Sequence, residues 1–189
     1  MPEHAREPRR GGTGGLRIPP VEEWDSWPFE GPVQPKALRA PEPEPPRDGE
    51  GDRPCTACGN TDAEYFWTDD HWRLLAIPPS GLPFVAILEP REHVDGPRDL
   101  SDAMLAEMGV MLARVERAVL TIPSIERVHI LRYGEGAAHL HWWFMARPTG
   151  VRQAASSFAM IWDDVLPPTP EDRWRENAAT IVAALHASA

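Results

Sequence analysis

The residues best suited to chemistry are His139 and His141, in the segment H-L-H-W-W-F that follows the turn G-E-G-A-A. Imidazole can act as a nucleophile, a general base or a metal ligand near neutral pH. In an extended strand alternate side chains share a face, so His139, His141 and Trp143 would point the same way, with the imidazoles about 7 Å apart. The pattern fits a functional site or, on its spacing alone, two histidines half-buried in a sheet.

A second group of reactive side chains is Cys55 and Cys58, in P-C-T-A-C-G-N. The tight turn of C-x-x-C-G lets two thiolates reach one ion, and its glycine permits the turn. Two thiolates supply half of a tetrahedral zinc site, so two more ligands must come from elsewhere. A redox pair of the thioredoxin type is the alternative, but it usually opens a helix, whereas Gly59-Asn60 predicts a turn. We therefore favour a metal site.

Three short β-type runs follow the cysteines, at 64–68, 71–77 and 84–89. Asp69-Asp70 and the stretch P-P-S-G separate them, which predicts an antiparallel meander. The segment P-R-E-H-V places His93 just beyond the end of the third strand.

The clearest predicted helix runs from Asp99 to about Thr121, because apolar residues recur there at steps of three and four. Asp99 or Ser101 can cap its start. A strand at 126–133 and the histidine strand come next. The apolar side chains of the histidine strand that should face a core are Leu140, Trp142 and Phe144.

Two closing helices are predicted at 151–166 and 170–186, the second with Thr169 as its N-cap and Pro170 at its first position. The whole pattern predicts an α+β fold: an antiparallel sheet of about five strands, one long helix and C-terminal helices. We place this domain at residues 53–189.

Residues 1–52 form a Pro/Gly-rich arm without sustained periodicity, which predicts an extended or disordered segment. Its exception is V-E-E-W-D-S-W-P-F at 21–29, where two tryptophans are a liability in water. We interpret this patch as a docking site on the chain's own domain or on a partner subunit. An exposed recognition motif for another protein is the alternative.

The composition excludes some classes of partner. A net charge of −10 argues against non-specific nucleic-acid binding, which needs Lys and Arg for the phosphates. No run of 18 apolar residues appears, so no membrane partner is expected, and the first residues lack the apolar core of a signal peptide. The chain is expected to be cytoplasmic, where two cysteines favour metal ligation over a disulfide.

The motifs follow a fixed order: a C-x-x-C knuckle, a meander, Pro90-x-x-His93, one long helix, a Gly-rich turn and H-x-H. This order resembles the histidine-triad (HIT) superfamily, including its galactose-1-phosphate uridylyltransferase branch. The resemblance covers roughly 54–148. It implies a homodimer that acts on a phosphorylated small molecule, most simply a nucleotide. It also implies one structural zinc, whose four ligands would be Cys55, Cys58, His93 and His139.

The resemblance further implies that His141 is a nucleophile that forms a nucleotidyl-histidine intermediate. Trp143 stands at the third triad position and can donate a hydrogen bond but cannot shuttle a proton. Glu135 replaces a Gln common before the triad, and Ile77 stands where many members have a ribose-binding Asp. The residues expected to hold phosphate are those of the turn together with a later arginine: Gly134, Glu135, Gly136, Ala137 and Arg147.

Two functional hypotheses follow from these residues. The first is an enzyme that hydrolyses or transfers a nucleotidyl group through His141. The second is a zinc-stabilised binding module without turnover, which Trp143, Ile77 and Glu135 favour. The presence of His141 favours the enzyme, because the zinc site needs only His139.

Overall fold

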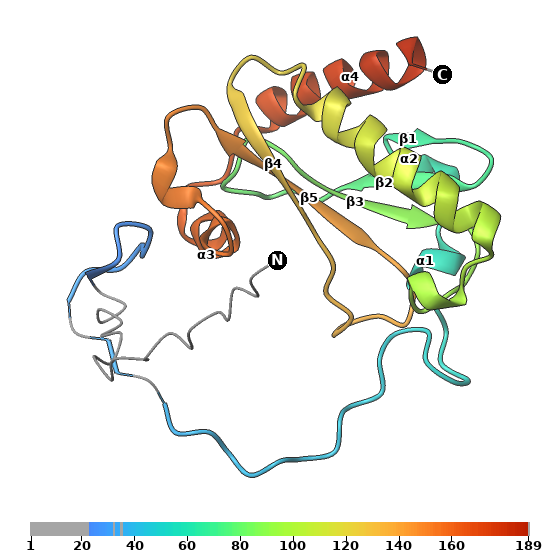
Figure 1. Ribbon diagram of the computed structural model, residues 1–189, viewed down its shortest axis with the longest axis horizontal. Helices are drawn as coiled ribbons and strands as arrows, with labels where there is room; N and C mark the ends of the chain where they lie inside the picture. Colours follow the sequence, from blue (N-terminus) through green and yellow to red (C-terminus); the bar gives the residue numbers. More distant parts are fainter. Residues whose placement is uncertain (1–22, 32, 35, 189) are drawn as a thin grey trace, which may run out of the picture.

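The computed structural model describes residues 23–31, 33–34 and 36–188. Within them one antiparallel sheet has the strand order β1-β2-β3-β5-β4, which confirms the predicted α+β fold (Figure 1). Meander pairing places β2 beside β3, and β5 then joins the free side of β3. The strands are β1 (Trp67–Thr68), β2 (Trp72–Ala76), β3 (Val85–Pro90), β4 (Ile125–Leu131) and β5 (Trp142–Pro148).

Two helices, α2 (Asp102–Val119) and α4 (Glu171–Ala187), cover one face of the sheet (Figure 1). The predicted apolar stripe of α2 packs there and is most deeply buried at Met111, Val115 and Val119. Ser101 caps α2, since its Oγ accepts the N–H of Met104 at 3.3 Å. Leu140 and Phe144 face this core, as the alternation predicted.

The helix α2 begins three residues later than expected, because Pro97–Asp99 forms a separate 3-10 turn, η3. The Asp99 carboxylate accepts the Gly96 N–H at 3.0 Å and so caps that turn instead of α2.

The histidine strand also begins later than expected, at Trp142, so His139 and His141 precede β5. The backbone between these two histidines is held outside the sheet, where the Leu140 N–H donates to the carbonyl of Val94 at 2.6 Å.

The opposite face of the sheet is covered in part by α3 (Phe158–Val165). The helix predicted at 151–166 is divided into the 3-10 turn η4 (Arg152–Ala154) and α3, because Ser156 adopts a left-handed backbone with φ of 56°. No Gly or Pro marks that break in the sequence.

Thr169 does not cap the last helix; α4 starts at Glu171 with Pro170 in the cap position. The Thr169 N–H donates to Ser80 O at 2.7 Å and its Oγ1 donates to Leu82 O at 2.8 Å. These bonds tie the connection before α4 to the β2–β3 turn.

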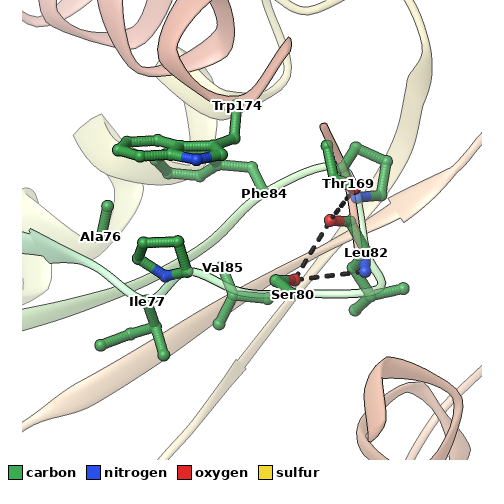
Figure 2. A pocket seen from close by; sticks show the side chains of 10 residues that line it. Ala76, Ile77, Ser80, Leu82, Phe84, Val85, Thr169 and Trp174 are labelled. Atoms are coloured by element: carbon green, nitrogen blue, oxygen red, sulfur yellow. Dashed lines mark hydrogen bonds between the residues drawn. The ribbon is translucent and has the colours of Figure 1, made fainter. Parts of the chain in front are cut away.

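Figure 2 shows a crevice beside this joint. It is lined by Trp174 of α4 and by Phe84, the residue directly before β3. Its volume is about 10 Å³, room for about one water molecule. Gly81 has no space for a side chain, because a Cβ there would lie 2.5 Å from the Asp163 carbonyl oxygen. The crevice is a packed joint and not a ligand site.

The described part of the tryptophan patch lies against α3. The ring centroid of Trp24 is 5.7 Å from that of Phe158, and that of Trp27 is 6.2 Å from it. The Trp162 indole donates to the carbonyl of Ser26 at 2.8 Å. Val21 and the rest of 1–22 lie outside the described residues. No helix in the described part of the chain is long and apolar enough to cross a membrane.

Candidate metal centre and adjoining cavity

The four residues expected to bind zinc lie together at the end of β3. Their donor atoms are all within 4.8 Å of one another. Cys55 Sγ is 3.4 Å from His139 Nδ1, and Cys58 Sγ is 3.3 Å from His93 Nδ1. Tetrahedral zinc, with Zn–S near 2.3 Å and Zn–N near 2.0 Å, separates sulfur from nitrogen by about 3.5 Å. The donor set and its geometry therefore fit one structural zinc ion.

His139 is oriented for this task by a bond on its other nitrogen. Nε2 donates to the carbonyl of Pro90 at 2.9 Å, which leaves Nδ1 unprotonated toward the sulfurs. Burial lowers the pKa of His139, which favours the neutral imidazole that ligates metals. Such a bond to the outer nitrogen is the usual means of fixing a ligand histidine.

The cysteine knuckle is one helical turn, α1 (Thr56–Gly59), with Cys55 at its N-cap. Burial, followed by the hydrogen bond with Cys55, raises the pKa of Cys58 to about 11. A coordinated cation reverses this preference, because a coordinating thiol is deprotonated. The Cys58 thiol therefore ionises more readily when a cation is bound to it.

Residues of the arm complete the knuckle, which the sequence did not indicate. The Asp48 carboxylate accepts the Thr56 N–H at 2.9 Å and its hydroxyl at 3.1 Å, and so caps α1. Gly49 has φ of +77°, and a Cβ there would lie 2.9 Å from both Cys55 Cβ and His93 Cε1. Only glycine fits this left-handed position against the metal ligands.

A buried ion pair supports the knuckle from the sheet. Arg73 and Glu89 stand opposite each other on β2 and β3, and Arg73 Nη2 is 3.1 Å from Glu89 Oε1. The Tyr65 hydroxyl also donates to Glu89, and burial followed by this bond raises the pKa of Tyr65 to about 12. Arg73 Nη2 further donates to the carbonyl of Ala57 in α1 at 2.9 Å.

His141 lies beside the metal centre at an open cavity of about 310 Å³. Its Nδ1 is 2.7 Å from the carbonyl oxygen of His139. A carbonyl only accepts, so Nδ1 carries the proton and Nε2 keeps its lone pair. The structure thus presents His141 in the tautomer that a nucleophile or general base requires.

The phosphate-binding residues expected in the turn are divided by the structure. Gly136 and Ala137 line the His141 cavity together with His139 and Trp143. Gly134 and Glu135 are not among its lining residues. The Gly134 carbonyl accepts a hydrogen bond from Arg47 at 3.1 Å, and the Glu135 side chain is exposed.

Arg147 lies apart from the His141 cavity, in a different cavity near the far end of β5. Its Nη1 donates to the carbonyl of Val151 at 3.2 Å. Ile77 packs with the apolar cluster of Leu82 and Val85 under α3.

The walls of the His141 cavity are partly apolar and carry no lysine or arginine among its described lining residues. Leu75, Ile87 and Trp143 form the apolar wall. The Trp143 ring centroid is 6.4 Å from that of His141, but its Nε1 is buried and unpartnered within the described chain. Trp143 therefore contributes shape to the cavity and no hydrogen bond.

The fold has counterparts among solved structures, all at low sequence identity. A hypothetical histidine triad nucleotide-binding protein from Sulfolobus tokodaii aligns with a TM-score of 0.53 and 13% identity, over 70% of this chain and 93% of that one. A histidine triad protein from Bradyrhizobium japonicum gives 0.51 and 22%, over 65% and 87%. A Zn-bound histidine triad family protein from Mycobacterium smegmatis gives 0.50 and 16%, over 70% and 90%.

These likenesses define the class of fold: the chain adopts the histidine-triad fold, as the sequence predicted. The matched proteins are covered almost completely, so the likeness extends over their whole domain. No protein-family model matches the sequence. A search of curated proteins finds no match either.

Proposed function

We propose that this chain is a HIT-type enzyme that hydrolyses or transfers a nucleotidyl group through a covalent intermediate on His141. One observation carries the proposal. The N–H at Nδ1 of His141 donates a hydrogen bond to the His139 carbonyl, so Nε2 is unprotonated and keeps its lone pair beside an open cavity. The same backbone carbonyl belongs to a metal ligand, so the nucleophile is oriented by the rigid metal centre.

The chemical step involves two displacements at phosphorus. His141 Nε2 attacks the α-phosphorus, an Nε2–P bond forms, and the bond to the leaving group breaks and its electrons depart with that group. An acceptor hydroxyl or water then attacks the phosphorus. The Nε2–P bond breaks, its electrons return to Nε2, and the acceptor's proton passes to solvent.

The cavity walls indicate which leaving groups suit this site. Trp143 cannot deliver a proton, so the leaving group must depart as an anion. A phosphoanhydride meets this requirement, because its leaving phosphate is stable when ionised. Backbone N–H groups of Gly136 and Ala137 can donate to phosphate oxygens, since both residues line the cavity.

The zinc ion proposed for Cys55, Cys58, His93 and His139 is structural, because four protein ligands leave no open coordination position. The Zn-bound protein from Mycobacterium smegmatis supports this assignment. Nucleotide as the substrate class is supported by the nucleotide-binding description of the Sulfolobus tokodaii protein. Residues 53–189 would form the HIT-like domain of a cytoplasmic homodimer, with 1–52 as its arm.

A zinc-stabilised binding module without turnover is the second candidate. The observations that favour it are the absence of a lysine or arginine among the described residues of the cavity wall and the buried Nε1 of Trp143. A phosphate bound there receives no cationic side chain, which lowers the transition-state stabilisation available.

The two candidates are separated by product formation with zinc-loaded protein. The substrates would be dinucleoside polyphosphates, nucleotide sugars and nucleoside phosphoramidates. We expect turnover of a phosphoanhydride that falls by about 10³-fold or more in His141→Ala. Trp143→His is the informative partner variant, because it introduces a proton donor. It should raise the rate for poor leaving groups more than for phosphoanhydrides. Binding without His141-dependent product would favour the module.

A further inference from the structure

A second cavity, of about 870 Å³, opens on the same face of the sheet as His141, at the outer ends of β4 and β5. Arg127, His129 and Arg147 line it from the strands, and Arg152 lines it from η4. Asp25 and Ser26 of the arm form its remaining polar wall, and the carbonyl of Ser26 is held there by the Trp162 indole. We call it the arginine cavity.

The register of the strands places two of these arginines directly opposite each other. Arg127 of β4 pairs with Arg147 of β5 across the antiparallel ladder. Like charges at directly opposed positions destabilise a sheet, because their Cβ atoms lie only about 5 Å apart. Arg127 is compensated by Glu126, at 2.8 Å, but Arg147 has no carboxylate within ion-pair distance among the described residues.

Burial raises the free-energy cost of the uncompensated charge on Arg147. Arg147 is only 9% exposed, and its Nη1 bonds are to the carbonyl oxygens of Pro148 and Val151. A buried cation without a counter-ion is costly. Arg152 lies on the rim of the same cavity, and it too lacks an ion pair in the described part of the chain. Both guanidinium groups occur in a chain of net charge −10, which has carboxylates in excess.

The pKa of the nearby His129 is consistent with an excess of positive charge in the arginine cavity. Its pKa is lowered, first by burial and then by Arg147. The one carboxylate on the cavity wall is Asp25, which forms no ion pair with these arginines within the described residues.

The arginine cavity is separate from the His141 cavity, with which it shares no lining residue. Trp143 and Arg147 are four positions apart on an extended strand, a distance of about 13 Å. Met145 lies between them and is buried under α3. A ligand in the arginine cavity is therefore held independently of the proposed reaction.

We propose that the arginine cavity binds an anionic ligand through a phosphate or polyphosphate group, with Arg147 and Arg152 as its charge partners. Guanidinium groups bind phosphate oxygens in pairs, and an anion over this face of β4 and β5 reduces the repulsion between the opposed arginines. The arm forms one wall of this site, where the carbonyl of Ser26 is fixed by Trp162, and the Asp25 carboxylate there weakens anion binding.

The test is calorimetric titration of the full-length, zinc-loaded protein with inorganic pyrophosphate at low ionic strength. We expect binding that weakens about tenfold in Arg152→Gln and at least as much in Arg147→Gln. Asp25→Asn should tighten binding several-fold. The control Arg175→Gln, which removes an exposed arginine of α4, should match the wild type.

The proposal is overturned if the wild type binds no pyrophosphate, or if Arg152→Gln binds as the wild type does. It is also overturned if His141→Ala abolishes binding, since the anion would then occupy the other cavity. Arg152 is exposed, so its variant decides the outcome even where Arg147→Gln proves unstable. Failure here leaves the turnover assay with His141→Ala unaffected.

Discussion

At the β3 end of the sheet face, the charged side chains beside the metal centre have polar side-chain partners, whereas at the β4 end the Arg147 guanidinium has only backbone partners among the described residues. Glu89 is held by Arg73 and Tyr65, and Asp48 is held by Thr56. Arg147 has carbonyl oxygens alone. The difference indicates that the first region is complete once it holds its metal, while the second requires an external anion.

The largest expected effect comes from breaking the metal centre. Cys58→Ala should reduce bound zinc from one ion per chain to none and lower the melting temperature by about 10 °C or more, because metal binding contributes to folding. Elemental analysis and calorimetry measure both quantities. Asp52→Ala, an exposed change in the same loop, is the matched control and should keep its zinc. A Cys58→Ala protein as stable as the wild type would contradict the structural role.

The next effect concerns the ion pair beneath the knuckle. Glu89→Ala leaves Arg73 buried and unpaired, which should cost about 3–5 kcal/mol in the free energy of unfolding. The double variant Arg73→Met with Glu89→Leu removes both charges and should cost clearly less. Chemical denaturation of the three proteins checks this. Equal losses in the single and double variants would show that the pairing of the charges is not what matters.

A smaller effect distinguishes crowding at the metal from backbone strain. Gly49→Ala combines a left-handed φ with contacts of 2.9 Å to Cys55 and His93, and should cost about 2–3 kcal/mol and weaken zinc binding. Gly51→Ala has a similar φ, +60°, but open space around it, so it should cost about 1 kcal/mol and leave zinc affinity unchanged. If both variants lose zinc equally, Gly49 has no special role at the centre.

The smallest effect lies on the surface, at His71. Its hydrogen bond with Glu107, at 2.9 Å, raises the pKa of His71 above its ordinary value. The pair therefore stabilises the fold fully below the unfolded pKa, and this contribution is lost as pH rises through the raised pKa. His71→Gln should lower the melting temperature more at about pH 5 than at about pH 8.5. The same shift at both pH values would contradict the ion pair.

The sequence predicted the metal ligands because the order of its cysteines and histidines is informative, while His141 as the nucleophile stays a prediction. It could also have indicated Arg73 and Glu89, since each interrupts an apolar strand and the meander places them opposite each other. Asp48 and Gly49 gave no such signal. Their role depends on the approach of the arm to Ala137, a contact between segments about ninety residues apart.

Arg147 differs from the metal ligands, because its place in the chain predicts that it joins the phosphate-binding turn, whereas the structure places it in another cavity. The strand direction carries it away from His141, because β5 begins only at Trp142 and runs on for seven residues. Position along a sequence motif says little about which cavity a side chain enters. The break of the helix at Ser156 was likewise invisible, because a non-glycine residue adopts the left-handed backbone there.

The most direct test of the proposed function is peptide mapping at alkaline pH, with zinc-loaded protein quenched in alkaline denaturant after mixing with a dinucleoside polyphosphate, because the N–P bond of the expected adduct is labile in acid. The account predicts a nucleotidyl group on the peptide that contains His141, bound through Nε2. The adduct should be absent from His141→Ala and retained in Arg147→Gln, because the two cavities are separate. Turnover with an adduct on any other residue, or with none in rapidly quenched samples, would contradict His141 as the nucleophile.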